Sequence, residues 1–139
     1  MKNIISLLTF LFLFIEIYSQ NVSTKNLSWR NIGPANMMGR IAAIDASNKD
    51  YRKVLIASAS GGVFKSDNAG VTWESIFDKY GAGSIGSVKF DQNDLNTIWV
   101  GTGESANRNS SAWGDGIYKS VDGGKTFKNM GLESTHQIA

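Results

Sequence analysis

One segment of this chain occurs twice in nearly the same form. Residues 62–73 return as residues 116–127 with the same order of residue types, Ser-x-Asx-x-Gly-x-Thr-aromatic. Self-similarity of this kind indicates a small supersecondary unit that is stacked several times. The shared positions are Ser66, Asn68, Gly70, Thr72 and Trp73 in the first copy, and Ser120, Asp122, Gly124, Thr126 and Phe127 in the second.

Each copy predicts two short strands joined by a tight turn. The segment 117–120 alternates apolar and polar residues, as a half-buried strand does. Asp122 can accept hydrogen bonds from backbone amides further along the turn, and Gly124 tolerates a positive φ. Asn68 can replace Asp122 in the first copy, because both side chains offer an acceptor oxygen.

Two further strands precede each hairpin, at about 40–45 and 53–57 in the first unit and 87–91 and 97–101 in the second, with Asp45 and Asp91 as matching positions. Four antiparallel strands per unit predict an all-β fold, a β-propeller built from four-stranded blades. The expected parts are an orphan outer strand at 27–33, blade one at 39–77, blade two at 84–131 and the start of blade three at 135–139. Two blades are too few to close a ring, so the sequence is expected to be the N-terminal fragment of a longer chain that supplies the remaining blades.

The repeated segment resembles the Asp box, or BNR repeat, of sialidases, xyloglucanase-type glycoside hydrolases and the N-terminal domain of sortilin-type receptors. This resemblance implies a β-propeller in which the Asp boxes are structural and lie on the rim, away from the ligand. The segments 29–34, 39–41 and 113–120 look like bacterial proteins that are classed with the sortilin N-terminal domain and loosely described as glycosyl hydrolases.

The chain departs from the xyloglucanase pattern at one position. Such enzymes carry a catalytic Asp in a Thr-Asp-Ile-Gly-Gly motif of the first blade, and the matching residues 58–62 place Ala59 there. Inverting glycosidases need two carboxyl groups, so this difference argues against hydrolysis by these blades.

Residues 1–19 resemble a secretory signal peptide, with Lys2 followed by an apolar stretch that is shorter than a membrane-spanning helix and is interrupted by Glu16. The absence of cysteine excludes disulfides and a lipoprotein anchor, and a secreted protein without cysteine is more typical of bacteria. A secreted or periplasmic protein with no membrane contact after cleavage is therefore expected. The net charge of +2, with both signs mixed along the chain, gives no basic stripe for nucleic acid.

The candidate ligand-binding residues are expected on the propeller face opposite the Asp boxes. A long insertion at 104–115 carries charges and a tryptophan, and such loops commonly hold binding sites. The candidates are Arg40, Glu104, Arg108, Trp113 and Asp115. The structural alternative is that Asp115 and Arg108 pair to hold the loop, Trp113 packs on the next blade and Arg40 forms a salt bridge. His136 is the only histidine, so neither a metal site nor any cofactor is expected, and no catalytic residue is assigned.

Two functions from different classes follow. The first is a secreted propeller that binds a peptide or a glycan on this face without chemistry. The alternative is a glycoside hydrolase, xyloglucanase- or sialidase-like, whose catalytic carboxylates lie mostly in other blades, with Glu104 or Asp115 contributing. A spacer role within a larger surface protein is a third, weaker hypothesis.

Overall fold

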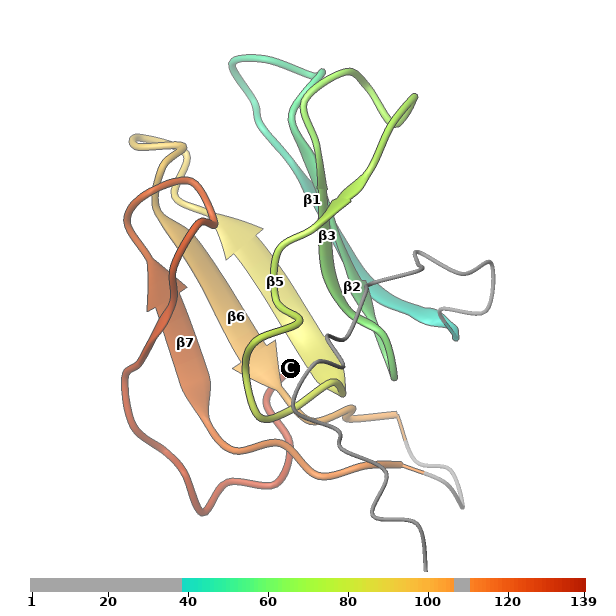
Figure 1. Cartoon of the computed structure of the whole chain (residues 1–139), viewed down its shortest axis with the longest axis vertical. Helices are drawn as coiled ribbons and strands as arrows, with labels where there is room; N and C mark the ends of the chain where they lie inside the picture. The colour runs from blue at the N-terminus through green and yellow to red at the C-terminus, as the bar shows by residue number, and fades with distance from the viewer. Residues whose placement is uncertain (1–38, 107–110) are drawn as a thin grey trace, which may run out of the picture. The chain divides into compact units, whose positions relative to one another are not determined.

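A computed structural model describes residues 39–106 and 111–139, and these residues form two four-stranded antiparallel sheets without a helix. The predicted signal peptide, the orphan strand and Arg108 lie outside the described residues. The first sheet contains β1 (Ile41–Ala46), β2 (Val54–Ser58), β3 (Gly62–Ser66) and β4 (Glu74–Ser75). The second contains β5 (Ile85–Phe90), β6 (Ile98–Thr102), β7 (Ile117–Ser120) and β8 (Lys128–Asn129). Each sheet is a simple meander, in which every strand pairs with its neighbour in sequence (Figure 1).

The core lies between the two sheets. Leu55, Ala57 and Val63 of the first sheet point toward Val88 and Val100 of the second, and all five are at most 1% exposed. Burial of apolar surface contributes about 25 cal/mol per Å², so the burial of these side chains stabilises the packing of the two sheets. An aromatic group closes the outer side of the core and consists of Phe77, Tyr80, Tyr118 and Phe127.

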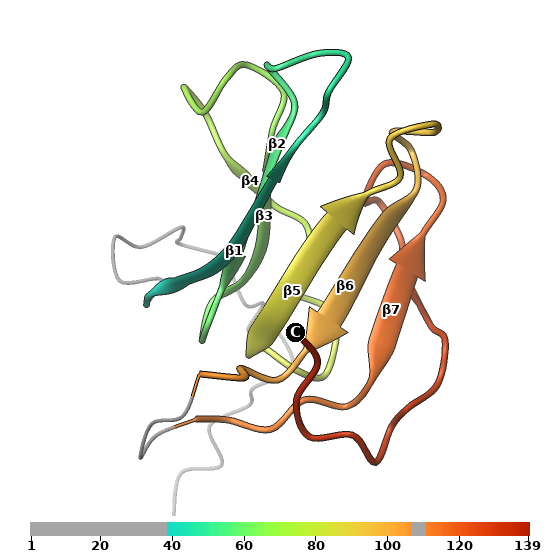
Figure 2. The same cartoon turned by 180° about the vertical axis from the view of Figure 1, so that it is seen from behind.

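The connections gather at two ends of the sheets, as Figures 1 and 2 show. One end, here called the turn end, carries the segments 47–53, 67–73, 91–97 and 121–127. The other, here called the loop end, carries 59–61 and the described parts of the β6–β7 connection, 103–106 and 111–116. The two ends are opposite because successive antiparallel strands reverse direction.

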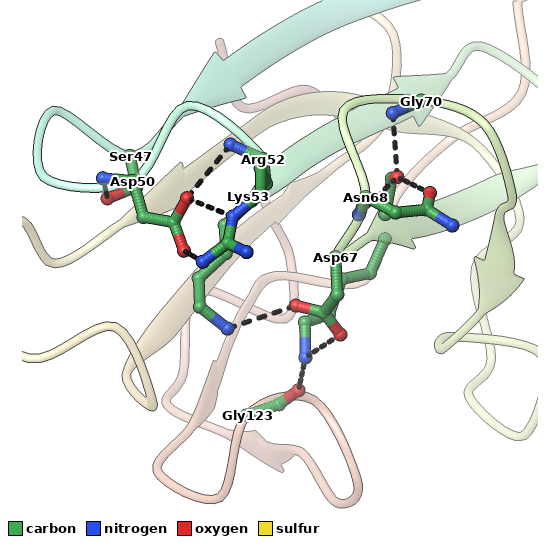
Figure 3. Close-up of polar contacts among 10 residues, drawn as sticks. Ser47, Asp50, Arg52, Lys53, Asp67, Asn68, Gly70 and Gly123 are labelled. Carbon is green, nitrogen blue, oxygen red and sulfur yellow. Dashed lines mark hydrogen bonds and ion pairs between the residues drawn. The ribbon is translucent and has the colours of Figure 1, made fainter.

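The two repeated turns have the same hydrogen bonds. Ser66 Oγ accepts from the backbone N–H of Gly70 at 2.8 Å and donates to Asn68 Oδ1 (Figure 3). Asn68 Oδ1 also accepts from the backbone N–H of Thr72. The equivalent bonds in the second turn join Ser120 to Gly124 and Asp122 to Ser120 and Thr126. In both turns the serine and the Asx side chains accept hydrogen bonds from the backbone N–H groups, as the sequence pattern predicts.

Polar contacts also join the two sheets. Asp45 Oδ2 accepts from the backbone N–H of Phe90 at 2.8 Å, and its Oδ1 accepts from Lys89 Nζ at 2.9 Å. Near the turn end, Lys65 Nζ donates to the carbonyl of Gly123 at 3.3 Å and lies 3.2 Å from Asp67 (Figure 3). The carboxylate of Asp45 thus covers a free backbone donor on the edge of the second sheet.

The sheet register corrects the match of Asp45 with Asp91. In the first sheet Asp45 pairs with Leu55, and in the second Lys89 pairs with Trp99. Because the backbone N–H of Ser47 bonds to Lys53 just as that of Asp91 bonds to Thr97, Asp91 occupies the place of Ser47. The structural equivalent of Asp45 is Lys89. The two aspartates share a residue type but not a place in the sheet, because backbone pairing sets the register of a strand.

The charge of the second turn makes its stability depend on pH. Hydrogen bonds from Thr126 and Ser120 hold the pKa of Asp122 well below its ordinary value of 3.8. Because folding lowers this pKa, the ionised carboxylate stabilises the folded protein at pH values above 3.8. This stabilisation is lost as the pH falls from 3.8 toward the lower pKa of the folded state.

We expect Asp122→Asn to leave stability at pH 7 nearly unchanged and to flatten the loss of Tm below pH 4. In the first turn Asn68 Nδ2 donates to Thr72 Oγ1 at 2.8 Å, whereas in the second Thr126 Oγ1 donates to Asp122 Oδ2. The substitution therefore keeps a bond to the threonine hydroxyl with its direction reversed and removes the titrating group. Thermal unfolding between pH 2 and pH 7 tests this. A variant whose acid destabilisation equals that of the parent protein would contradict it.

Candidate functional site

The loop end is assembled around the segment 81–84, which enters the second sheet. The carbonyl of Gly83 accepts from the N–H of Gly62, and the carbonyl of Ser84 accepts from the N–H of Gly103. Gly81 lies so close to Asp115 that an added Cβ would come within 2.7 Å of Oδ2. This segment therefore joins the short 59–61 connection of the first sheet to the long 103–116 connection of the second.

Two predicted site residues, Arg40 and Glu104, form an ion pair in this region. The Glu104 side chain is only 3% exposed, whereas that of Arg40 is 44% exposed. The backbone N–H of Glu104 donates to the buried Ser84 Oγ at 3.1 Å, which fixes the position of its backbone. A buried carboxylate requires a charged partner, and Arg40 supplies it. The Glu104 carboxylate therefore forms a salt bridge with Arg40, which is the structural role that the sequence analysis gave as the alternative for Arg40.

Asp115 is held by hydroxyl groups. Tyr118 Oη donates to its Oδ2 at 2.8 Å, Thr102 Oγ1 lies 3.2 Å from its Oδ1, and its backbone N–H donates to Thr102 Oγ1 at 2.8 Å. Burial and the bond to Asp115 raise the pKa of Tyr118, so the phenol remains a donor. This network fixes the start of β7. Pairing of Asp115 with Arg108 stays a prediction, because Arg108 lies outside the described residues.

Trp113 forms an exposed aromatic surface. Its ring is stacked on that of His136, with centroids 4.0 Å apart and planes 5° apart, yet Trp113 is still 69% exposed. The N–H of Gly114 donates to the carbonyl of His136 at 2.8 Å and anchors the pair. Trp113 therefore combines a fixed orientation with a free surface, the combination suited to stacking on a ligand.

Ala59 lies at the same end and is 2% exposed. Its backbone N–H donates to the carbonyl of Arg40 at 2.9 Å, so the position has a structural role and brings no carboxylate. The structure also adds Ser84, Thr102 and Tyr118, which sequence reasoning did not select. Their only sequence signal is a polar residue next to a strand end, which is too common to be informative.

Among residues 39–106 and 111–139, no group of three His, Asp or Glu side chains is placed to hold a metal ion. Within these ranges there is also no helix long and apolar enough to cross a membrane.

A cavity of about 360 Å³ lies at the turn end, away from the predicted site residues, and its lining includes Lys65, Asp67, Asn96 and Lys125. Lys65 and Asp67 form a salt bridge with each other, so their charges are less available to a ligand in this cavity than the exposed side chains at the loop end.

Comparison with known proteins supports the fold. No family model and no curated protein sequence matches the chain. Among solved structures, a GH74 enzyme from Niastella koreensis is 25% identical with a TM-score of 0.50, and the match covers 65% of this chain and 13% of that enzyme. An ancestral GH74 enzyme is 18% identical with a TM-score of 0.56, covering 74% of this chain and 14% of the enzyme.

The chain has the fold of GH74 propeller blades. Its two sheets are therefore consecutive four-stranded blades of a β-propeller, as the sequence predicted. The chain spans about one seventh of the length of the enzymes that it matches.

Proposed function

We propose that this chain supplies two blades and part of the glycan-binding surface of a secreted propeller of the glycoside hydrolase type. The similarity to the GH74 enzyme from Niastella koreensis is the observation that carries this proposal. It favours the hydrolase hypothesis over the sortilin-type peptide receptor, because the similar solved structures are GH74 enzymes. The repeated turns act as Asp boxes in this proposal and stabilise the blades at the end opposite the ligand.

Trp113 is the central binding residue of the proposal. A pyranose ring presents C–H groups on one face, and an exposed indole that is already fixed by His136 binds such a face at a low entropic cost. The exposed part of the Arg40 guanidinium adds N–H donors for sugar hydroxyl groups.

The carboxylates have a supporting role. Glu104 is buried against Arg40, and Asp115 accepts from Tyr118 and lies beside Thr102, so neither is placed as a free general acid. Ala59 offers no carboxyl group. The acid and base of a hydrolase built on this chain would therefore come from outside the described residues.

Calorimetric titration with a panel of soluble plant and bacterial oligosaccharides tests the proposal. We expect binding by the parent protein and a loss of at least about 10-fold in affinity for Trp113→Ala, since a hot-spot aromatic contributes about 2 kcal/mol or more. Val71→Ala is the matched control, because Val71 is 80% exposed but lies at the turn end. Equal affinities for Trp113→Ala and the parent protein would refute this role for Trp113, and a panel without any bound glycan would refute the function.

Binding without hydrolysis is the second candidate. It is favoured by Ala59 and by the engaged state of Glu104 and Asp115. Release of reducing ends from the bound glycan separates the two functions. If the protein binds but releases none, the binding function holds. If Asp115→Asn abolishes release while leaving affinity and Tm unchanged, the supporting role assigned to Asp115 is wrong.

A further inference from the structure

The outer edge of the first sheet is open. β4 pairs with β3 on one side, and within the described part of the chain no strand pairs with its other side. The backbone N–H of Ile76 donates to the carbonyl of Val63 at 3.0 Å, which fixes the phase of the β3–β4 ladder. Because the backbone groups of successive residues point to opposite sides of a strand, the N–H and C=O of Ser75 point away from β3. Such an edge is a template for pairing with another chain.

A cleft runs along this edge. The lining of one cavity, of about 180 Å³, includes residues 74–76 of the first sheet and Gly124 and Lys125 of the second turn. The cavity of about 360 Å³ at the turn end shares these residues except Ser75, so the two cavities are adjacent parts of one cleft. Successive side chains of a strand point to opposite faces, so a cavity lined by all three residues lies along the edge of β4. These two cavities are together called the β4 cleft.

The base of the β4 cleft is closed by packing between the two sheets. Gly124 is buried and lies against the half-buried Ile76, since an added Cβ at Gly124 would come within 2.8 Å of Ile76 Cδ1. Tyr80 also lines the cleft, and its ring is stacked on that of Phe77 in the core. The β4 cleft is therefore a surface feature with a fixed base, open along the edge of the first sheet.

Lysines carry the free charges of the β4 cleft. Lys79 and Lys125 are exposed members of its lining, and neither forms an ion pair within the described ranges. The carboxylates are held by their neighbours, since Asp78 accepts from Ser75 Oγ, Asp122 accepts from Thr126 Oγ1, and Glu74 lies across the ladder from Lys65. An occupant that carries carboxylates therefore finds two lysines without a partner.

We infer that the β4 cleft binds an extended acidic peptide segment of a partner protein, which adds to the free edge of β4 as a further strand. The N–H and C=O of Ser75 hold the peptide backbone, and the peptide's carboxylates meet Lys79 and Lys125. A strand suits this edge better than a sugar does, because Tyr80 is engaged with Phe77 and offers no free ring face. This site is separate from the loop end, so it goes beyond the proposed function.

A fluorescent, terminally blocked peptide in which glutamate alternates with threonine tests the inference on the intact chain. We expect saturable binding in fluorescence anisotropy that weakens with added salt, because exposed ion pairs are screened. The same peptide with lysine in place of glutamate should bind at least about 5-fold more weakly. A glutamate peptide with N-methylated backbone amides should not bind, because it cannot donate to the edge of β4.

Two substitutions at Ser75 separate the role of the backbone from that of the side chain. Ser75→Pro removes the outward N–H, and proline is tolerated at an edge position of this kind, so the variant should fold and lose the peptide. Ser75→Ala is the matched control, because it keeps the N–H and loses only the hydroxyl that bonds to Asp78. Thermal unfolding confirms that both variants are folded.

Charge reversal gives a second matched pair. Lys125→Glu should weaken binding of the glutamate peptide at least about 5-fold, because a repulsion replaces an exposed ion pair. Lys128→Glu makes the same change of charge at an exposed position of β8 outside the cleft lining, and should leave binding unchanged.

Several results would overturn the inference. They are no binding of the glutamate peptide at high micromolar concentration, equal binding of the lysine or the N-methylated peptide, peptide binding by Ser75→Pro equal to that by Ser75→Ala, and equal losses for Lys125→Glu and Lys128→Glu. Trp113→Ala should leave peptide binding unchanged. A parent chain that binds the peptide but no glycan refutes the proposed function alone, and the reverse result refutes this inference alone.

Discussion

Phe77→Ala is expected to lower the free energy of unfolding by about 3–5 kcal/mol, the usual cost of removing a buried phenylalanine ring. Phe77 is 1% exposed and lies in the connection between the two sheets. Its ring stacks on Tyr80 at 4.9 Å and meets the edges of Tyr118 and Phe127 at 5.2 and 5.1 Å. The alanine leaves a cavity that these three rings cannot refill, because each is held in place elsewhere.

Two of those constraints are hydrogen bonds. Tyr80 Oη accepts from the backbone N–H of Phe127 at 2.7 Å, and Tyr118 Oη donates to Asp115. The rings therefore cannot move into the space without breaking a buried polar contact. Urea unfolding monitored by circular dichroism measures the change. Val71→Ala serves as the control, since Val71 is 80% exposed and should change stability by less than about 0.5 kcal/mol. A loss below 1 kcal/mol for Phe77→Ala would show that the aromatic group does not hold the two sheets together.

The sequence predicted those parts of the fold that depend on near neighbours. The turn of Ser120 and Asp122 could be inferred because its hydrogen bonds span two to four residues, and a local pattern specifies them. The strands were predicted for the same reason, since the alternation of apolar side chains is local. The match of Asp45 with Asp91 was wrong by two residues, because a carboxylate can precede or follow the end of a strand and the sequence alone does not show which.

The site was harder to predict, because its contacts join distant residues. Arg40 and Glu104 were both selected, but their pairing depends on how two sheets dock, and no local pattern contains that information. The partners of Asp115 were missed for a related reason. Thr102 lies on the far side of the long 103–116 connection, so the contact forms only once β6 and β7 are paired. Trp113 was selected as a candidate because a large aromatic residue in a polar loop is unusual by composition alone, and its role in ligand binding stays a prediction.

Gly103→Ala is expected to destabilise the loop end by at least about 2 kcal/mol, through backbone strain and a collision together. Gly103 has φ = +83°, a conformation that L residues rarely adopt. An added Cβ would meet the carbonyl oxygen of His136 and would lie 2.8 Å from the N of Gly114. These two groups are hydrogen-bonded to each other, so the methyl group would separate the segment that carries His136 from the loop that carries Trp113.

Two other glycines separate the two causes. Gly131 has φ = +108° and no atom within 4 Å of an added Cβ, so Gly131→Ala measures the strain of a positive φ alone, at roughly 1–2 kcal/mol. Gly83 is not at positive φ and would meet only the Ser60 carbonyl at 3.8 Å, so Gly83→Ala should be nearly neutral. Unfolding free energies should therefore rank Gly103→Ala as the most destabilised, followed by Gly131→Ala and then Gly83→Ala. Tryptophan fluorescence should change only for Gly103→Ala, since only that substitution disturbs the stacking of Trp113 on His136. If Gly131→Ala is as damaging as Gly103→Ala, strain alone accounts for the effect, and the contact between residues 114 and 136 does not hold the tryptophan in place.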